Sequence, residues 1–159
     1  MTDLHANSSA VAAALDAAGA HGQVRTLSES ARTAVEAAAA LGVPVGAIAS
    51  SLLFMADGVP LLVLTSGAHR VDTAHVAQLL DVGELSRASA EQVRAATGQP
   101  IGGVSPVGHP APVRTLIDTA LQEFDVIWAA AGTPHAVFPT SYGELVRICA
   151  AEPVTVRAG

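Results

Sequence analysis

The stretch "GAIASSLLFMADGVPLLVLT" (residues 46–65) decides the expected fold of this chain. Two apolar runs flank the turn-forming residues "ADGVP" (56–60). An Asp-Gly step between apolar runs is a strong hairpin signal, so the runs are predicted to pair as antiparallel strands. Side chains alternate between the two faces of a strand, so Ser50 and Ser51 are expected to face opposite sides of the sheet.

The length and composition predict one soluble, cytoplasmic domain that spans residues 1–159. Half of the residues are hydrophobic and the mean hydropathy is +0.44, but the excess is mostly alanine. No apolar run reaches the roughly 18 residues of a membrane helix, and the N-terminus lacks the basic segment of a secretory signal. The single cysteine, Cys149, excludes an internal disulfide and fits a reducing compartment. We therefore expect no membrane partner.

The charge pattern restricts both the partners and the chemistry of the chain. The formal net charge is −6, so no global field attracts nucleic acid. Any contact with RNA must therefore be local, and DNA is not expected as a partner. All eight basic residues are arginines, which excludes lysine-dependent chemistry.

Outside the hairpin, apolar periodicity and capping signals predict alternating helices and strands. Thr33 with Glu36 and Ser89 with Gln92 have the spacing of capping boxes. The helices are expected at 8–19, 28–42, 72–80, 89–98 and 141–150, and the strands at 22–27, 124–132, 135–139 and 153–157. This order favours an α/β (mixed α+β) fold, with one mixed, mostly antiparallel sheet flanked by helices.

The segment "TGQPIGGVSPVGHPAP" (97–112) is too rich in glycine and proline to form a regular element. Gly102 and Gly103 allow backbone N–H groups to approach a carbonyl oxygen or an oxyanion closely. On composition alone, an ordinary surface connection remains the alternative interpretation.

Two histidines are further candidates for a site. His109 lies in the same Gly/Pro segment, and His135 lies at a turn before a strand, so the two could meet in one pocket or simply be solvated. Cys149 is expected in the core rather than as a nucleophile. The sequence contains no motif for nucleotides, cofactors or metal ions, so we expect none of these groups.

Four segments together resemble a known family. They are "IASSLLFMADGVPLLVLTSGAHRVD" (48–72), "ATGQPIGGVSPVGH" (96–109), "LIDTALQEFDVIWAAAG" (116–132) and "SYGELVRICAA" (141–151). Their order and spacing are similar to the YbaK/EbsC family, the freestanding relatives of the prolyl-tRNA synthetase editing domain, over about 24–156. The resemblance implies a mixed-sheet α/β fold and hydrolysis of the ester that joins a wrong amino acid to the tRNA 3′ ribose. The implied partners are the 3′ end of a mischarged aminoacyl-tRNA and, as a candidate, an aminoacyl-tRNA synthetase.

The resemblance also implies roles for individual residues. The family's GxxxP loop matches Gly102, Gly103, Val104, Ser105 and Pro106, and the backbone of Gly102–Ser105 would hold the aminoacyl carbonyl and position water. The expected substrate-binding residues are Ser50, Pro106, His109, Gly132 and His135, and the expected structural residues, which form hydrogen bonds, are Ser51 and Asp118.

One departure from the family leaves the function open. Many members have a lysine where this chain has Ser50, and no other lysine is present to replace it. Without that cation, hydrolysis would depend on the loop amides, a bound water and the ribose 2′-hydroxyl. The alternatives are a non-catalytic protein that binds aminoacyl-tRNA or a related small ligand, and a hydrolase of another small ester or amide. Both a monomer and a homodimer are compatible with the sequence.

Overall fold

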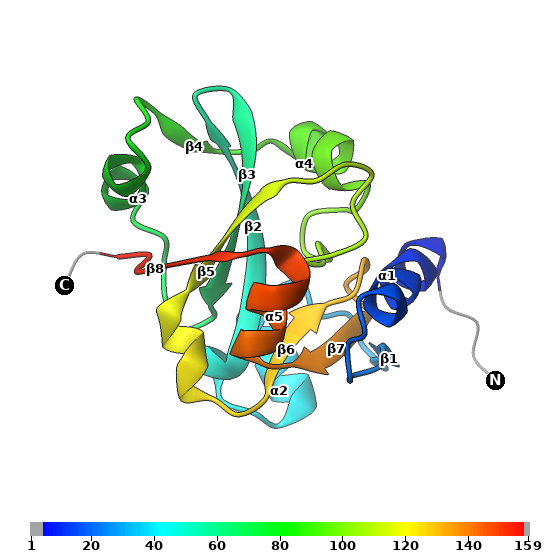
Figure 1. Cartoon of the computed structure of the whole chain (residues 1–159). Helices are drawn as coiled ribbons and strands as arrows, with labels where there is room; N and C mark the ends of the chain where they lie inside the picture. Colours follow the sequence, from blue (N-terminus) through cyan, green and yellow to red (C-terminus); the bar gives the residue numbers. More distant parts are fainter. Residues whose placement is uncertain (1–4, 158–159) are drawn as a thin grey trace.

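The computed structural model describes residues 5–157, which form an eight-stranded mixed sheet with helices packed against it (Figure 1). The strands are β1 (Arg25–Thr26), β2 (Ile48–Ala56), β3 (Val59–Ser66), β4 (Leu85–Arg87), β5 (Arg114–Asp118), β6 (Ile127–Ala130), β7 (Ala136–Thr140) and β8 (Glu152–Val154). The helices are α1 (Ala6–Ala17), α2 (Ala34–Leu41), α3 (Thr73–Leu80), α4 (Ala90–Thr97) and α5 (Tyr142–Cys149), with 3₁₀ helices η1 (Val45–Ala47) and η2 (Thr119–Glu123). The strand order is β1-β7-β6-β2-β3-β5-β8, and β4 pairs separately with β2.

The predicted hairpin is confirmed as the pair β2–β3 at the centre of this sheet. Its turn residues Asp57 and Gly58 have φ angles of 49° and 82°. Aspartate and glycine tolerate this left-handed backbone, which matches the twist of the strands that a two-residue turn connects.

The rest of the sheet mixes both pairing directions. Strand β2 pairs antiparallel with β4 and parallel with β6, while β7 lies antiparallel to both β1 and β6. Strand β5 is parallel to its two neighbours, β3 and β8. The predicted mixed, mostly antiparallel sheet is therefore confirmed.

Several predicted boundaries differ from the structure. Helix α2 begins at Ala34 rather than near residue 28, because Thr33 is its N-cap and closes a capping box with Glu36. The strand expected at 22–27 is ordered as a strand only over Arg25–Thr26. Strands β4 and β5 have no counterpart among the predicted elements, because each is short and is defined by pairing with distant residues rather than by its own alternation.

Alternation along β2 divides the core between the two faces of the sheet. Leu53 belongs to the largest hydrophobic cluster, which includes Val11 of α1 and side chains of α5. Phe54 points to the opposite face and packs in a cluster with Val76 of α3, and Ile48 clusters with α2. Both faces of β2 are therefore covered by helices (Figure 1).

The buried carboxylate of Asp118 joins the ends of β3 and β5. Its Oδ2 accepts hydrogen bonds from the Ser66 N–H at 3.0 Å, the Thr65 hydroxyl at 3.3 Å and His69 Nδ1 at 2.9 Å. Its Oδ1 accepts from the Ala120 N–H at 3.0 Å and so caps η2. A carboxylate that is only 2% exposed requires such donors, because water cannot solvate it.

We predict that Asp118→Ala destabilises the fold by roughly 2–4 kcal/mol, because the substitution leaves these buried donors without an acceptor. Urea unfolding at constant pH measures the change in the free energy of unfolding. The exposed Asp125 provides the matched control, and Asp125→Ala is expected to change that free energy by less than about 0.5 kcal/mol. Equal effects of the two substitutions would contradict this role of Asp118.

Candidate active site

The edge of β2 that faces away from β3 is only partly paired. Strand β6 pairs with it at Ile48 and Ala49, and β4 pairs with it again from Phe54 onward. The Leu53 carbonyl still accepts the Ala88 N–H at 3.1 Å. Between these two partners, the edge of β2 at Ser51 is left open.

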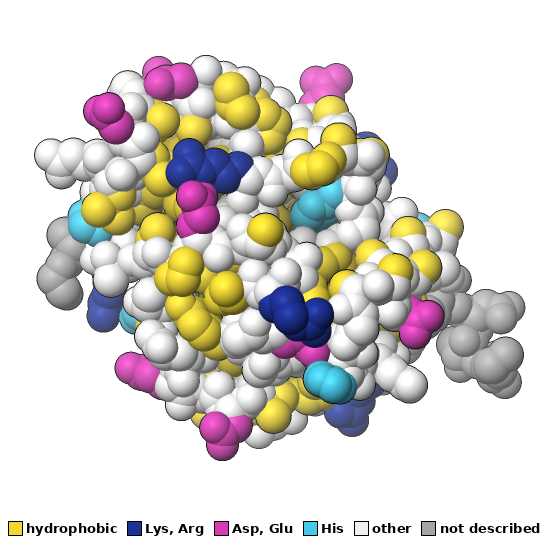
Figure 2. Space-filling model, in the orientation of Figure 1, with side chains coloured by type: hydrophobic (Ala, Val, Ile, Leu, Met, Phe, Trp, Pro, Cys, Tyr) yellow, Lys and Arg dark blue, Asp and Glu magenta, His cyan; other side chains and the backbone are white. Residues whose placement is uncertain are grey.

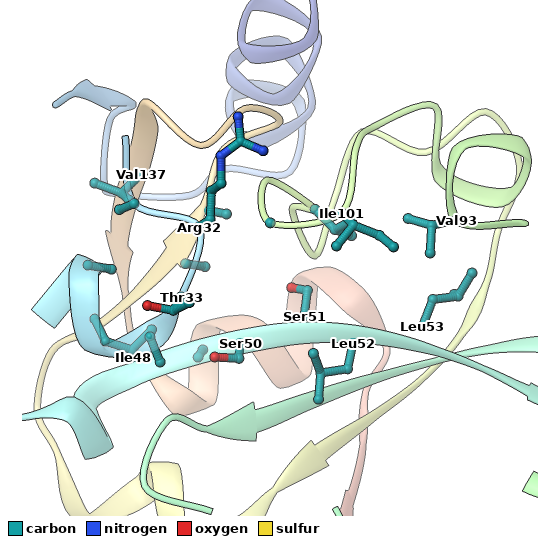
Figure 3. Close-up of a pocket in the computed structure, with 18 of the residues that line it drawn as sticks. Arg32, Thr33, Ile48, Ser50, Ser51, Leu52, Leu53, Val93, Ile101 and Val137 are labelled. Atoms are coloured by element: carbon teal, nitrogen blue, oxygen red, sulfur yellow. The ribbon is translucent and has the colours of Figure 1, made fainter. Parts of the chain in front are cut away.

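A cavity of about 220 Å³ lies at this open edge (Figure 3). It is lined by Ser50–Leu53 of β2, by residues 31–34 and Ala37 at the start of α2, by Val93 of α4, and by Ile101, Gly102 and Val104 of the Gly/Pro segment. Because the cavity lies at an unpaired stretch of β2 between β6 and β4, residues from both faces of β2 contribute to it. Figure 3 shows Ser51 and Leu53 on the side of Ile101 and Val93, with Ser50 nearer to Thr33 and Ile48.

The positions of Ser50 and Ser51 relative to the cavity differ from those expected. Both line the cavity, whereas only Ser50 was expected to face the substrate. The Ser51 Oγ atom is buried and has no hydrogen-bond partner among the described residues. The expectation that the Ser51 hydroxyl is hydrogen-bonded within the core is therefore wrong, because no group of the described residues lies within hydrogen-bonding distance of it.

In the expected catalytic loop, some backbone N–H groups donate hydrogen bonds within the protein and others do not. The Gly103 N–H donates to the Pro100 carbonyl at 3.0 Å, and the Ser105 N–H donates to Gln99 Oε1 at 2.6 Å. Within residues 5–157, the N–H groups of Gly102 and Val104 have no protein acceptor. Gly102 and Val104 are also the two members of this loop that line the cavity, so their N–H groups are the candidates for binding a ligand oxygen.

The two adjacent glycines are required for different reasons. Gly102 has a φ of 89°, a conformation that is strained for other residues. A Cβ on Gly103 would lie 2.6 Å from the Thr133 carbonyl carbon, which is backbone and cannot move aside easily. Gly103 therefore packs the loop against the turn after β6 while Gly102 turns it toward the cavity.

Gly132 has a comparable packing role on the other side of that turn. Its φ is 94°, and a Cβ there would lie 2.9 Å from the backbone of Asn7 in α1. Its carbonyl accepts a hydrogen bond from Asn7 Nδ2 at 3.1 Å. Gly132 does not line the cavity, so the structure places it against α1 rather than at the expected substrate position.

Of the two alternatives for His109 and His135, the structure excludes a shared pocket. His109 and Pro106 line a second, more open hollow of about 370 Å³ between α1, α5 and the Pro-rich end of the loop. His135 is exposed and lines neither hollow. His109 Nε2 donates to the Ser105 carbonyl at 2.7 Å, and burial lowers the pKa of the imidazole, although this hydrogen bond opposes the shift. His109 is therefore neutral near pH 7 and fixes the end of the loop.

Two arginines at the cavity could not be singled out from the sequence. Arg32 precedes α2 and Arg87 ends β4, and they are the only charged residues that line the cavity among those described. The Arg87 guanidinium lies 5.6 Å from the centre of the Phe54 ring, a cation–π contact that holds it at this edge. The sequence offers no local signal for either residue, because the tertiary fold alone brings them together.

Other kinds of site are not found in the described part of the chain. Among residues 5–157, no three His, Cys, Asp or Glu side chains gather in a way that could hold a metal ion. None of the helices described there is long and apolar enough to span a bilayer.

Comparisons with known proteins identify the family of this chain. The family description "Aminoacyl-tRNA editing domain" matches residues 28–148. This chain belongs to the aminoacyl-tRNA editing domain family. The resemblance inferred from the four sequence segments is therefore confirmed.

Curated relatives contain this domain as a small part of a larger protein. The proline–tRNA ligase of Nitratidesulfovibrio vulgaris strain Hildenborough is 39% identical over 92 residues, which are 58% of this chain and 16% of the ligase. The ligase of Geobacter sulfurreducens is 31% identical over 132 residues, which are 77% of this chain and 23% of the ligase. The chain thus spans between about a sixth and a quarter of these relatives.

A solved structure matches over nearly the whole chain. It is described as "a putative trans-editing enzyme for prolyl tRNA synthetase", with a TM-score of 0.90 and 39% identity, and the match covers 99% of this chain and 100% of that one. A second, of a hypothetical protein, has a TM-score of 0.86 and 28% identity over 92% of this chain and 98% of that one.

We predict that Cys149 is unreactive in the folded protein. Its thiol contacts the Pro106 carbonyl at 3.5 Å, and burial raises the pKa of the thiol to about 12. At pH 8 only about one thiol in ten thousand is then ionised, compared with about one in ten at the ordinary pKa. Alkylation by iodoacetamide should be roughly a thousandfold slower in native buffer than in urea, and should still rise with pH above 9. A native rate that levels off near pH 9 would contradict the raised pKa of this half-buried thiol.

Proposed function

We propose that this protein is a trans-editing aminoacyl-tRNA deacylase, which hydrolyses the ester between a small mischarged amino acid and the tRNA 3′ ribose. The observation that carries the proposal is the cavity at the open edge of β2, with the free Gly102 and Val104 N–H groups at its wall. The family assignment supports the same reaction class.

The reaction can proceed without a protein nucleophile. The ester carbonyl accepts hydrogen bonds from the loop amides, and the negative charge that develops on this oxygen in the transition state strengthens them. A water molecule adds to the carbonyl carbon, and the bond from this carbon to the 3′ oxygen then breaks. The vicinal 2′-hydroxyl of the ribose relays a proton from this water to the departing 3′ oxygen, so the products are the free amino acid and the tRNA 3′-hydroxyl. Loss of one such donor typically lowers the rate by about 10²–10³.

The walls of the cavity favour a small amino acid side chain. Eight of the lining residues are alanines, and they come from several elements around the open edge of β2: Ala31, Ala34, Ala37, Ala49, Ala88, Ala129, Ala130 and Ala136. Ser50 and Thr33 add hydroxyl groups on the side of α2, where the family's lysine is absent. The volume of about 220 Å³ leaves room for a short aminoacyl group together with water.

A panel of mischarged tRNAs tests the proposal directly. We expect at least one tRNA that carries a small amino acid to lose its ester faster than in buffer alone. Gly103→Ala should lower this rate by about 100-fold, because the added methyl group displaces the loop. Gly143 in α5 is the matched control, since a Cβ there meets nothing within 4 Å, and Gly143→Ala should keep the wild-type rate. Absence of hydrolysis on every tRNA of the panel would refute the enzyme assignment.

A non-catalytic binder of aminoacyl-tRNA is the second candidate, favoured because the described residues that line the cavity include no carboxylate, histidine or lysine. Binding of a mischarged tRNA without hydrolysis, unchanged in Ser50→Lys, would select this candidate. A free aminoacyl ester that is hydrolysed as well as the tRNA ester would instead indicate a hydrolase of small esters.

We further propose that Arg32 and Arg87 contact phosphates at the 3′ end of the tRNA. Both line the cavity, and no carboxylate among the described lining residues neutralises them. On the face shown in Figure 2, basic side chains are scattered rather than gathered into a broad patch, which fits local contacts to a single-stranded end. A cytoplasmic location and cooperation with a prolyl-tRNA synthetase are part of the same proposal.

We predict that the double variant Arg32→Gln, Arg87→Gln binds tRNA with lower affinity, and that this affinity depends less strongly on the salt concentration. Each lost phosphate contact should reduce the slope of log K against log salt by about 0.7. Arg114 is the matched control, because its Nε is paired with Glu152 at 2.7 Å and it lies outside the cavity. Fluorescence anisotropy at several salt concentrations measures the slope, and an equal change in Arg114→Gln would argue against specific contacts.

A further inference from the structure

Ser51 lines the cavity and has three polar groups without a hydrogen-bond partner among the described residues. Its Oγ is the only buried side-chain oxygen or nitrogen in the described residues that lacks a hydrogen-bond partner. A buried polar group without a partner is destabilising, so native proteins rarely keep one where no ligand or water meets it.

The main chain of Ser51 adds the other two groups. On the β3 side of β2, the Ile48 carbonyl accepts the Gly67 N–H, and on the opposite side the Leu53 carbonyl accepts the Ala88 N–H. Backbone groups alternate between the two edges of an antiparallel strand, so the N–H and C=O of Ser51 point to the same edge as those of Leu53. No strand pairs with that edge at Ser51, because β6 stops at Ala49 and β4 starts beyond it.

An aminoacyl group in this cavity brings an α-ammonium that needs acceptors. Among the described residues, the lining contains no carboxylate and no histidine. The ammonium must therefore be bound by neutral oxygens, and hydrogen bonds to a charged donor are stronger than those between neutral groups. Ser51 supplies two such oxygens, its Oγ and its carbonyl oxygen, at one unpaired point of the sheet.

We propose that Ser51 is the binding residue for the α-ammonium group of the substrate, which donates to the Ser51 carbonyl and Oγ and takes the place of a strand partner. This inference rests on the proposed function and deepens it. It makes the protein selective for esters with a free α-amino group over esters of the same shape that lack it. A site that hydrogen-bonds one polar group of its ligand discriminates strongly against analogues without that group.

The test compares two stable amide probes, 3′-alanylamino-3′-deoxyadenosine and its lactyl counterpart, in which a hydroxyl replaces the ammonium. Wild-type protein should bind the alanyl probe at least tenfold more tightly by isothermal titration calorimetry. Ser51→Ala should lose about tenfold in affinity for the alanyl probe and less than about threefold for the lactyl probe. The thermal midpoint of Ser51→Ala should stay equal or rise, because an unsatisfied buried hydroxyl is removed, whereas a structural role would lower it.

Ser50→Ala is the matched comparison, because Ser50 lines the same cavity from the other face of β2. It should keep the preference for the alanyl over the lactyl probe even if it changes both affinities. Equal losses for both probes in Ser51→Ala, a fall in its thermal midpoint, or no binding of either probe to wild type would each overturn the inference. Probe binding needs no turnover, so a protein that binds with this preference but hydrolyses no mischarged tRNA would refute the deacylase and leave the role of Ser51 supported.

Discussion

The incomplete pairing of one edge of β2 is the constraint on which the rest of the structure depends. Along its other edge, β2 is paired with β3 from end to end. Along the edge that faces away from β3, β6 pairs with one end of β2 and β4 pairs with the other. The middle of this edge is unpaired, and the cavity lies there. A fully paired strand would leave no backbone groups for a ligand and no space for it between α2 and the Gly/Pro loop.

In the Gly/Pro loop opposite this edge, some backbone amides hold the loop in shape and others remain free for a ligand. Gly103 and Ser105 use their amides to hold the loop in shape, through Pro100 and Gln99. Gly102 and Val104 alternate with them and keep free N–H groups at the cavity. The site therefore consists of main-chain groups on two sides of a small space, and most of the side chains around it are apolar. Such a site depends on a fixed backbone geometry more than on the titration of any side chain.

The sequence predicted the parts of this arrangement that are encoded locally. The Asp57–Gly58 turn fixes the hairpin, and adjacent glycines at 102 and 103 indicate a loop that approaches a ligand. The open edge could not be predicted, because it depends on where β4 and β6 begin and end against β2, and those contacts join residues far apart in the chain. For the same reason Ser51 was assigned to the core and His109 to the substrate pocket. Alternation shows that two serines face different sides, but it does not show that a cavity reaches both.

The central claim is that the aminoacyl group occupies the space between the open edge of β2 and the Gly/Pro loop. Amide chemical shifts in a ¹H–¹⁵N spectrum, recorded while 3′-alanylamino-3′-deoxyadenosine is added, test this claim most directly. We expect the largest changes at Ser51, Gly102 and Val104, whose amides are free, and smaller ones at Gly103 and Ser105, whose amides are already bonded. Changes centred on His109 and Cys149, in the second hollow, would contradict it.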